Sequence, residues 1–323
     1  MAYLHQISAR LVREFIVVFS LELCLCNLLH AQQDHSMDAN LFTAIGQRDL
    51  VAVERLLRAG ANIEARGANG VTPLMEAAEQ GNTPALNLLL ANGAEANKRD
   101  NQGETALTWA ARGGWVHLVN QLAQLSNLKD KNHALFEAVR GGPVVLAMVE
   151  TNLPTQPQTQ PNQVVESWPA TVESLLANGA ELEARSEDGS TPLIEAAAYA
   201  QTDTFKLLMQ KGARLNVTDK YGNTPLIAAA CQCALATMNS AEEVIQILLA
   251  SGADVNARNH DGRTALMLAS GMQGDAAVLE LLVANGADGR LKDKNGKTAL
   301  ALAKDSRRED KIRVLEKAYS GIH

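Results

Sequence analysis

Apolar and polar positions repeat along this chain with a period close to 33 residues. A short phrase occurs six times with small changes, as GVTPL, GETAL, GSTPL, GNTPL, GRTAL and GKTAL. The Leu of each phrase, or the Leu that stands in its place, is found at Leu41, Leu74, Leu107, Leu135, Leu193, Leu226, Leu266 and Leu300. Successive gaps are 33, 33, 28, 58, 33, 40 and 34 residues. A period of this length indicates an array of repeated structural units.

Each phrase predicts the start of a pair of helices. In GNTPL, the Thr224 hydroxyl is placed to accept a hydrogen bond from a free backbone N–H at a helix start. Pro225 then falls in the first helical turn, where its missing N–H costs nothing. A second helix is predicted over EEVIQILLASGA, and Gly252 is suited to the left-handed backbone that ends it. The polar stretch ADVNARNHDG that follows predicts a hairpin-like finger.

These phrases and the glycines that end the second helices resemble the ankyrin repeat. The helix-ending glycines are Gly60, Gly93, Gly179, Gly212, Gly252 and Gly286. The resemblance covers residues 38–319 and implies an all-α repeat solenoid of stacked helix-turn-helix ankyrin repeats with hairpin-like fingers. About eight units are expected. One unit cannot bury its own apolar face, so the units must stack.

Irregular gaps predict departures from the regular stack. The gap of 28 residues before Leu135 predicts a truncated finger. The gap of 58 predicts a long insert near residues 151–169, rich in Pro, Gln and Thr, and the gap of 40 predicts a shorter insert near residues 231–241. A loop of this length adds little to the entropic cost of closure, so the stack tolerates it. Residues 320–323 are expected to form a short tail.

Residues 1–31 lie outside the repeat and have the pattern of an export signal. Arg10 and Arg13 precede an apolar run, and a small-residue cleavage site follows at Ala31. A short linker at residues 32–37 would then lead into the stack. The protein is expected to be exported, to the periplasm or outside the cell, with no membrane contact beyond this signal. An uncleaved membrane anchor and an amphipathic or disordered leader are the alternatives.

Charge and motif content narrow the function classes. The formal net charge of -7 lacks the basic surface that neutralises phosphates, so no nucleic-acid partner is expected. No nucleotide-binding, metalloprotease or hydrolase motif is present, so no catalytic residue, cofactor or metal site is predicted and an enzyme is not expected. Cys231 and Cys233 form a Cys-x-Cys pair. They are interpreted as small apolar residues at a helix end, as a disulfide, or as a redox or metal-binding pair.

The resemblance implies that a protein partner binds the concave face formed by first helices and fingers. Candidates on the first helices are the residues just after the phrase and one aromatic residue further on: Met75, Glu76, Thr108, Trp109, Ile194, Glu195, Tyr199, Ile227 and Met267. Candidates on the finger tips are Asn101, Gln102, Glu187, Tyr221, His260 and Arg263. We expect a groove around Trp109 and Tyr199 to contact the partner, although Trp109 is equally suited to fill the gap beside the truncated finger.

The predicted function is a non-enzymatic protein–protein interaction module or scaffold. The protein is expected to be a monomer that binds no cofactor. Two alternatives remain. One is a redox- or metal-linked accessory protein that uses Cys231 and Cys233. The other is a secreted effector that binds host proteins.

Overall fold

The computed structural model describes residues 37–141, 167–232, 238–271 and 276–319. The chain divides into two compact units, Met1–Glu104 and Thr105–His323, which are described separately below. All regular elements in the described residues are helical, as predicted for an all-α repeat solenoid. Among these residues, no helix combines the length and apolar character that crossing a bilayer requires.

The first unit contains two helix pairs within its described residues. Its elements are a helical segment at residues 37–46, α2 (Leu50–Arg58), the 3-10 turn η1 (Ala68–Gly70), α3 (Pro73–Glu79) and α4 (Thr83–Ala91). Helix α4 packs against both α2 and α3. The side chain of Asn82 donates a hydrogen bond of 2.9 Å to the Ile45 carbonyl oxygen and so ties the two pairs together.

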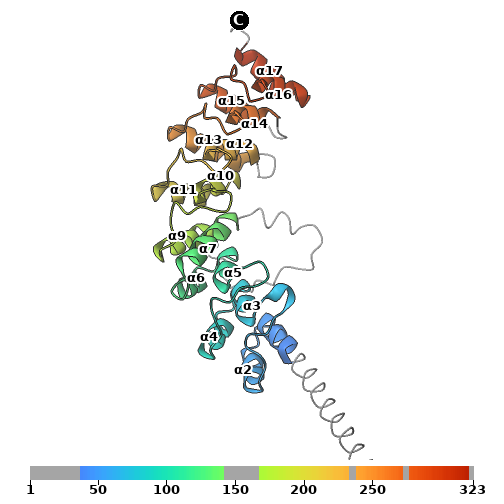
Figure 1. The fold of residues 1–323 in the computed structure, drawn as a ribbon, viewed down its shortest axis with the longest axis vertical. Helices are drawn as coiled ribbons and strands as arrows, with labels where there is room; N and C mark the ends of the chain where they lie inside the picture. Colours follow the sequence, from blue (N-terminus) through green and yellow to red (C-terminus); the bar gives the residue numbers. More distant parts are fainter. Residues whose placement is uncertain (1–36, 142–166, 233–237, 272–275, 320–323) are drawn as a thin grey trace, which may run out of the picture. The chain divides into compact units, whose positions relative to one another are not determined.

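The second unit has two layers of helices (Figure 1). The inner layer holds the first helix of each pair: α5 (Ala106–Arg112), α7 (Leu128–Arg140), α10 (Pro192–Ala198), α12 (Pro225–Gln232), α14 (Ala265–Gly271) and α16 (Ala299–Asp305). The outer layer holds the second helices: α6 (Val116–Ala123), α9 (Trp168–Ala177), α11 (Thr202–Gln210), α13 (Met238–Ala250), α15 (Ala277–Ala284) and α17 (Glu309–Tyr319). Within each layer every helix packs against the next one in order.

The repeated phrase begins the inner helices as the sequence predicts. The Thr224 hydroxyl accepts a hydrogen bond of 3.3 Å from the Ile227 N–H, and α12 starts at Pro225. The same contact, also 3.3 Å long, recurs at Thr72 and at Thr191. Each threonine satisfies a backbone donor that the helix leaves without an internal acceptor.

Fingers are closed hairpin-like turns that bond to one another. In the finger at residues 219–223, the Asp219 N–H donates to the Asn223 carbonyl at 3.1 Å, and Asp219 Oδ1 accepts from Tyr221 N and Asn223 N at 2.8 Å. The Tyr221 carbonyl then accepts 2.8 Å away from the His260 N–H of the next finger. An arginine, exemplified by Arg185, bridges its own finger and the next by donating to the carbonyls of Gly189 and Thr218.

The irregular region of the second unit differs from the sequence prediction at its boundaries. The truncated finger is observed, because only four residues separate α6 from α7. Helix α7 starts at Leu128, seven residues before Leu135, because the Asn127 side chain caps it by accepting from the Asp130 N–H at 3.0 Å. The predicted long insert also ends too late, since α9 begins at Trp168. Residues 151–166 of that insert lie outside the described residues.

The shorter predicted insert is helical at both of its described ends. Helix α12 continues through Gln232, and α13 begins at Met238. Residues 233–237, which include Cys233, lie outside the described part, as do the predicted signal, residues 32–36 of the predicted linker and the tail.

Candidate functional site

A narrow strip of polar and aromatic side chains runs over the inner helices α5, α7 and α10. On α5 and α7 the contributing positions lie two and five residues after the Leu of the phrase, and at α10 they lie two and six residues after Leu193. Because positions three or four residues apart lie on the same face of a helix, these side chains share one face. We call the following residues the inner strip: Trp109, Arg112, Glu137, Arg140, Glu195 and Tyr199.

Charges alternate along the inner strip and pair across successive helices. Arg112 Nη2 lies 2.8 Å from Glu137 Oε2, and Arg140 Nη1 lies 3.4 Å from Glu137 Oε1. Arg140 also donates two hydrogen bonds, of 3.1 and 3.2 Å, to the Glu195 carboxylate. Such two-point contacts fix geometry as well as energy, so the strip is held in one arrangement.

The carboxylates of the inner strip are more deeply buried than its guanidinium groups. The side chains of Glu137 and Glu195 are 13% and 11% exposed, whereas those of Arg112 and Arg140 are 32% and 37% exposed. Burial opposes the charge on Arg140, but the hydrogen bonds and charge of Glu195, with the charge of Glu137, raise its pKa above the usual value. The guanidinium groups are therefore the more exposed part of the inner strip.

Aromatic rings lie beside these guanidinium groups. The Arg112 guanidinium stacks 4.9 Å from the centroid of the half-buried Trp109 ring, and that of Arg140 lies 5.9 Å from the Phe136 ring. The Trp168 indole N–H donates to the Arg112 carbonyl at 3.2 Å. Trp109 is thus partly accessible on the inner strip, and part of its ring is covered by the Arg112 guanidinium.

Five of the residues predicted to bind a partner are buried and cannot do so in this fold. They are at most 2% exposed and directly follow the Leu of each phrase: Met75, Thr108, Ile194, Ile227 and Met267. They pack against the neighbouring helices, and Thr108 Oγ1 in addition accepts from the Thr105 N–H at 2.8 Å. The next position along the helix is half-buried at Glu76 and Trp109, whereas Glu195 at the same position of α10 is buried at 8% exposure.

The predicted finger residues keep their surface positions. Asn101, Gln102, Glu187, Tyr221 and His260 are exposed, and Arg263 is half-buried. Tyr221 and His260 lie on neighbouring fingers joined by the backbone hydrogen bond described above. Sequence reasoning missed Arg112, Glu137 and Arg140. The signal available for them was the fixed spacing of two and five residues from Leu107 and Leu135.

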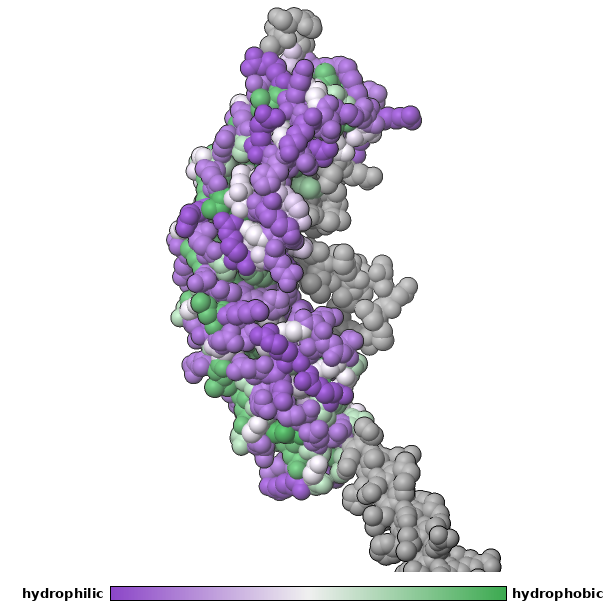
Figure 2. Space-filling view, viewed as in Figure 1, coloured by the Kyte–Doolittle hydropathy of each residue, from purple (hydrophilic) through white to green (hydrophobic). Residues whose placement is uncertain are grey.

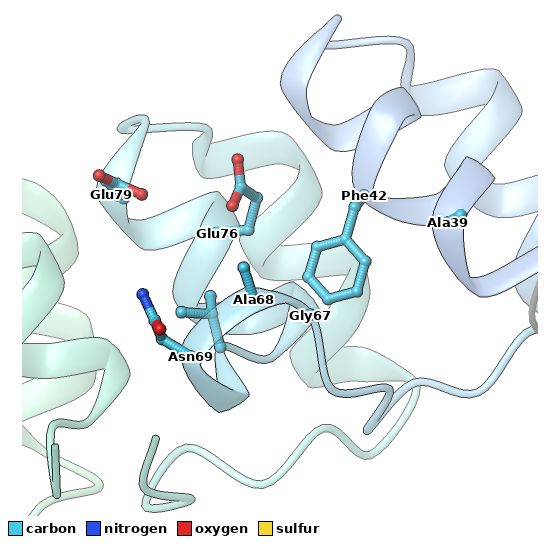
Figure 3. A pocket seen from close by; sticks show the side chains of 8 residues that line it. Ala39, Phe42, Gly67, Ala68, Asn69, Glu76 and Glu79 are labelled. Carbon is cyan, nitrogen blue, oxygen red and sulfur yellow. The ribbon is translucent and has the colours of Figure 1, made fainter. Parts of the chain in front are cut away.

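The first unit has a hollow of about 500 Å³, which we call the Phe42 hollow. Its apolar side chains and its carboxylates are Ala39, Phe42, Ala68, Val71, Glu76 and Glu79. Figure 3 shows that Phe42 comes from the helix at residues 37–46, Glu76 and Glu79 from α3, and Ala68 from the 3-10 turn η1. This volume lies within the range of small-ligand and side-chain pockets.

Cys231 lies at the same register as Arg112 and Arg140, five residues after the Leu of its phrase. It is half-buried, and burial raises the pKa of its thiol, an effect only partly offset by the charge of Arg263. A raised pKa disfavours the thiolate, which is the reactive and metal-binding form. Cys233, the other member of the pair, lies outside the described residues, so the redox or metal alternative stays a prediction.

Cys231 is accordingly expected to react slowly with alkylating reagents near neutral pH. The test uses a variant with Cys24, Cys26 and Cys233 changed to Ser, in which the rate of iodoacetamide alkylation is measured against pH. The midpoint of the rise in rate should lie at a higher pH for the folded variant than for the same variant unfolded. The reason is that the buried thiol loses its proton at higher pH. A midpoint below that of the unfolded control would support the redox interpretation.

The capped inner helices, the outer helices and the bonded fingers together define a helical repeat protein. The family profile described as "Ankyrin repeats (3 copies)" matches residues 16–100, 74–156, 166–239 and 233–322. The chain belongs to the ankyrin repeat family. Its first matched stretch begins inside the range predicted to be a signal peptide. Ankyrin repeats indicate a protein–protein interaction module.

Several curated proteins share this repeat sequence. Ankyrin repeat and KH domain-containing protein mask-1 of Caenorhabditis elegans is 31% identical over 227 residues, which are 67% of this chain and 8% of that protein. Transient receptor potential cation channel subfamily A member 1 of Homo sapiens is 29% identical over 217 residues, 67% of this chain and 17% of that protein. Glycerophosphocholine phosphodiesterase gde1 of Schizosaccharomyces pombe is 35% identical over 111 residues, 34% of this chain and 10% of that protein. The chain thus spans only a small part of each relative.

Proposed function

We propose that this chain is an exported, non-enzymatic interaction module that binds a protein partner through the inner strip and the exposed finger tips. The observation that carries the proposal is the ordered row of stacked and bidentate contacts from Trp109 to Glu195. Arginine and tryptophan are the side chains most often found at energetic centres of protein interfaces. A row already fixed by ion pairs loses little conformational entropy when a partner binds.

The surface favours a selective contact over nonspecific hydrophobic association. Figure 2 shows a face that is mostly hydrophilic, with hydrophobic residues scattered in small groups. Export is proposed from the pattern of residues 1–31 alone. A role as an effector acting on another organism's proteins would use the same surface and differs only in the identity of the partner.

Loss of partner binding is expected when the inner strip is truncated. Residues 32–323 would be immobilised and used to capture proteins from the exported fraction of the source cells, and the recovered partner would then be titrated. Trp109→Ala and Arg140→Ala should each weaken its affinity about tenfold or more, because each removes a central contact. Arg313→Ala, which changes an exposed charge on α17, is the matched control.

Two results would contradict the proposal. One is full partner affinity in both Trp109→Ala and Arg140→Ala, with helical content unchanged by circular dichroism. The other is recovery of a small molecule and no stoichiometric protein.

A further inference from the structure

We propose that the Phe42 hollow binds a short segment of a protein in which an apolar side chain stands next to Lys or Arg. This inference rests on the proposed interaction function and adds the chemistry of one partner segment. It concerns the first unit alone.

The floor of the hollow is apolar and closely fitted. A Cβ atom on Gly67 would lie 3.2 Å from Phe42 Cζ, so the Phe42 ring rests directly against the loop backbone. Val71 and Phe42 are half-buried and hence still present apolar surface to the hollow. Covering that surface with a Leu or Phe side chain removes it from water, which is the favourable term in such contacts.

The rim supplies negative charge where a basic neighbour would sit. Glu76 and Glu79 are three residues apart on α3, so both reach the same side of the helix. Glu76 is half-buried, and its hydrogen-bond partner is the neutral Gln80 amide. Burial raises the pKa of Glu76, with the Gln80 hydrogen bond acting in the opposite direction. Within the described residues, no basic side chain forms an ion pair with Glu76.

Charge over the whole unit favours the same occupant. Residues 37–104 contain nine acidic and six basic side chains, a net charge of -3. A basic segment approaches this surface with electrostatic attraction, whereas an acidic one meets repulsion at Glu76. An apolar segment without a cation would fill the floor and leave the half-buried carboxylate unpaired.

Selection from a peptide library tests the chemistry directly. A phage-displayed library of random dodecapeptides would be panned on the full chain and counter-selected on Ala39→Trp, which fills the hollow from an exposed helical position. Recovered sequences should share Leu, Phe or another large apolar residue next to Lys or Arg. Acidic consensus sequences, or no enrichment over the Ala39→Trp variant, would overturn the proposal.

A synthetic copy of the enriched peptide then tests the contacts by fluorescence anisotropy. Glu76→Gln should lower its affinity about fivefold, as expected for a partly exposed ion pair. Glu54→Gln removes the same charge from α2 and should leave affinity unchanged. Equal affinities for Glu76→Gln and wild type would overturn the proposal. Dimerisation of the wild type that Ala39→Trp abolishes would also overturn it, because the occupant of the hollow would then be a second copy of the chain.

Failure here is distinguishable from failure of the proposed function. Should Ala39→Trp keep full affinity for the captured protein while Trp109→Ala loses it, the interaction function stands and the hollow is not part of it. Loss in neither variant would instead count against the interaction surface as a whole.

Discussion

Replacing Phe205 with alanine is expected to lower the free energy of unfolding by about 3–5 kcal/mol, the range for deleting a buried aromatic ring. Phe205 has no solvent exposure and lies on α11, which packs against α9, α10 and α13. Helices held from three sides cannot collapse fully into the space left by the ring, so a cavity remains. Phe205→Leu keeps most of the volume and should cost less than half as much.

The damage should also remain local. Among the described residues of the second unit, the extensive contacts of each helix pair are with adjacent pairs. Stability in such arrays is a sum of units and nearest-neighbour interfaces. Hydrogen exchange measured by mass spectrometry should therefore accelerate most in α9, α11 and α13 and least in α17. Urea unfolding followed by circular dichroism supplies the free energies. Uniform acceleration across the second unit would contradict the nearest-neighbour account.

Helix starts were predictable because the signals that produce them are local. A threonine that caps and a proline that follows act within one turn, so GNTPL specifies the start of α12 without help from the rest of the chain. The start of α7 was not predicted because its segment lacks that phrase. There Asn127 caps the helix, and an Asn in the polar stretch before α7 gives a weaker signal than Thr-Pro-Leu.

Candidate site residues were predicted less well because exposure depends on neighbours in space. An inner helix is covered by the inner helices on either side and by its own outer helix, which leaves one narrow face open. Met75 and Glu76 are adjacent in sequence, yet Met75 is buried and Glu76 is half-exposed. In this pair the polarity of the two residues already indicated which one is buried, whereas Thr108 and Glu195 show that polarity alone does not decide it, since both are polar and buried.

The ion pairs of the inner strip could not be predicted from spacing alone. Arg112 and Glu137 are 25 residues apart, and Arg140 and Glu195 are 55 apart. In a regular repeat of 33 residues these two positions would be 30 residues apart, three fewer than the period. The truncated finger shortens one separation and the insert lengthens the other. Only the stacked arrangement shows that the same register is met on three successive helices.

The second large expected effect is the loss of stability when a finger glycine, Gly222, is replaced by alanine. Gly252, which follows α13, provides the comparison. Gly222 and Gly252 have positive φ angles of 80° and 86°, a conformation in which an alanine costs about 1–2 kcal/mol. A Cβ on Gly252 would meet no atom within 4 Å, whereas one on Gly222 would lie 2.8 Å from the backbone nitrogen of His260. The two sites therefore share the same strain, and only Gly222 adds a clash with the next finger.

Gly222→Ala is expected to cost about 3 kcal/mol in total and Gly252→Ala about 1 kcal/mol, since overpacking adds to the conformational strain at the first site. The clash pushes the His260 N–H away from the Tyr221 carbonyl, so the hydrogen bond between neighbouring fingers is lost as well. Free energies of unfolding for both variants, with exchange of the His260 amide proton, measure the two effects separately. Equal losses of stability would mean that the fingers yield to the added methyl group, and that their contacts do not hold the stack in register.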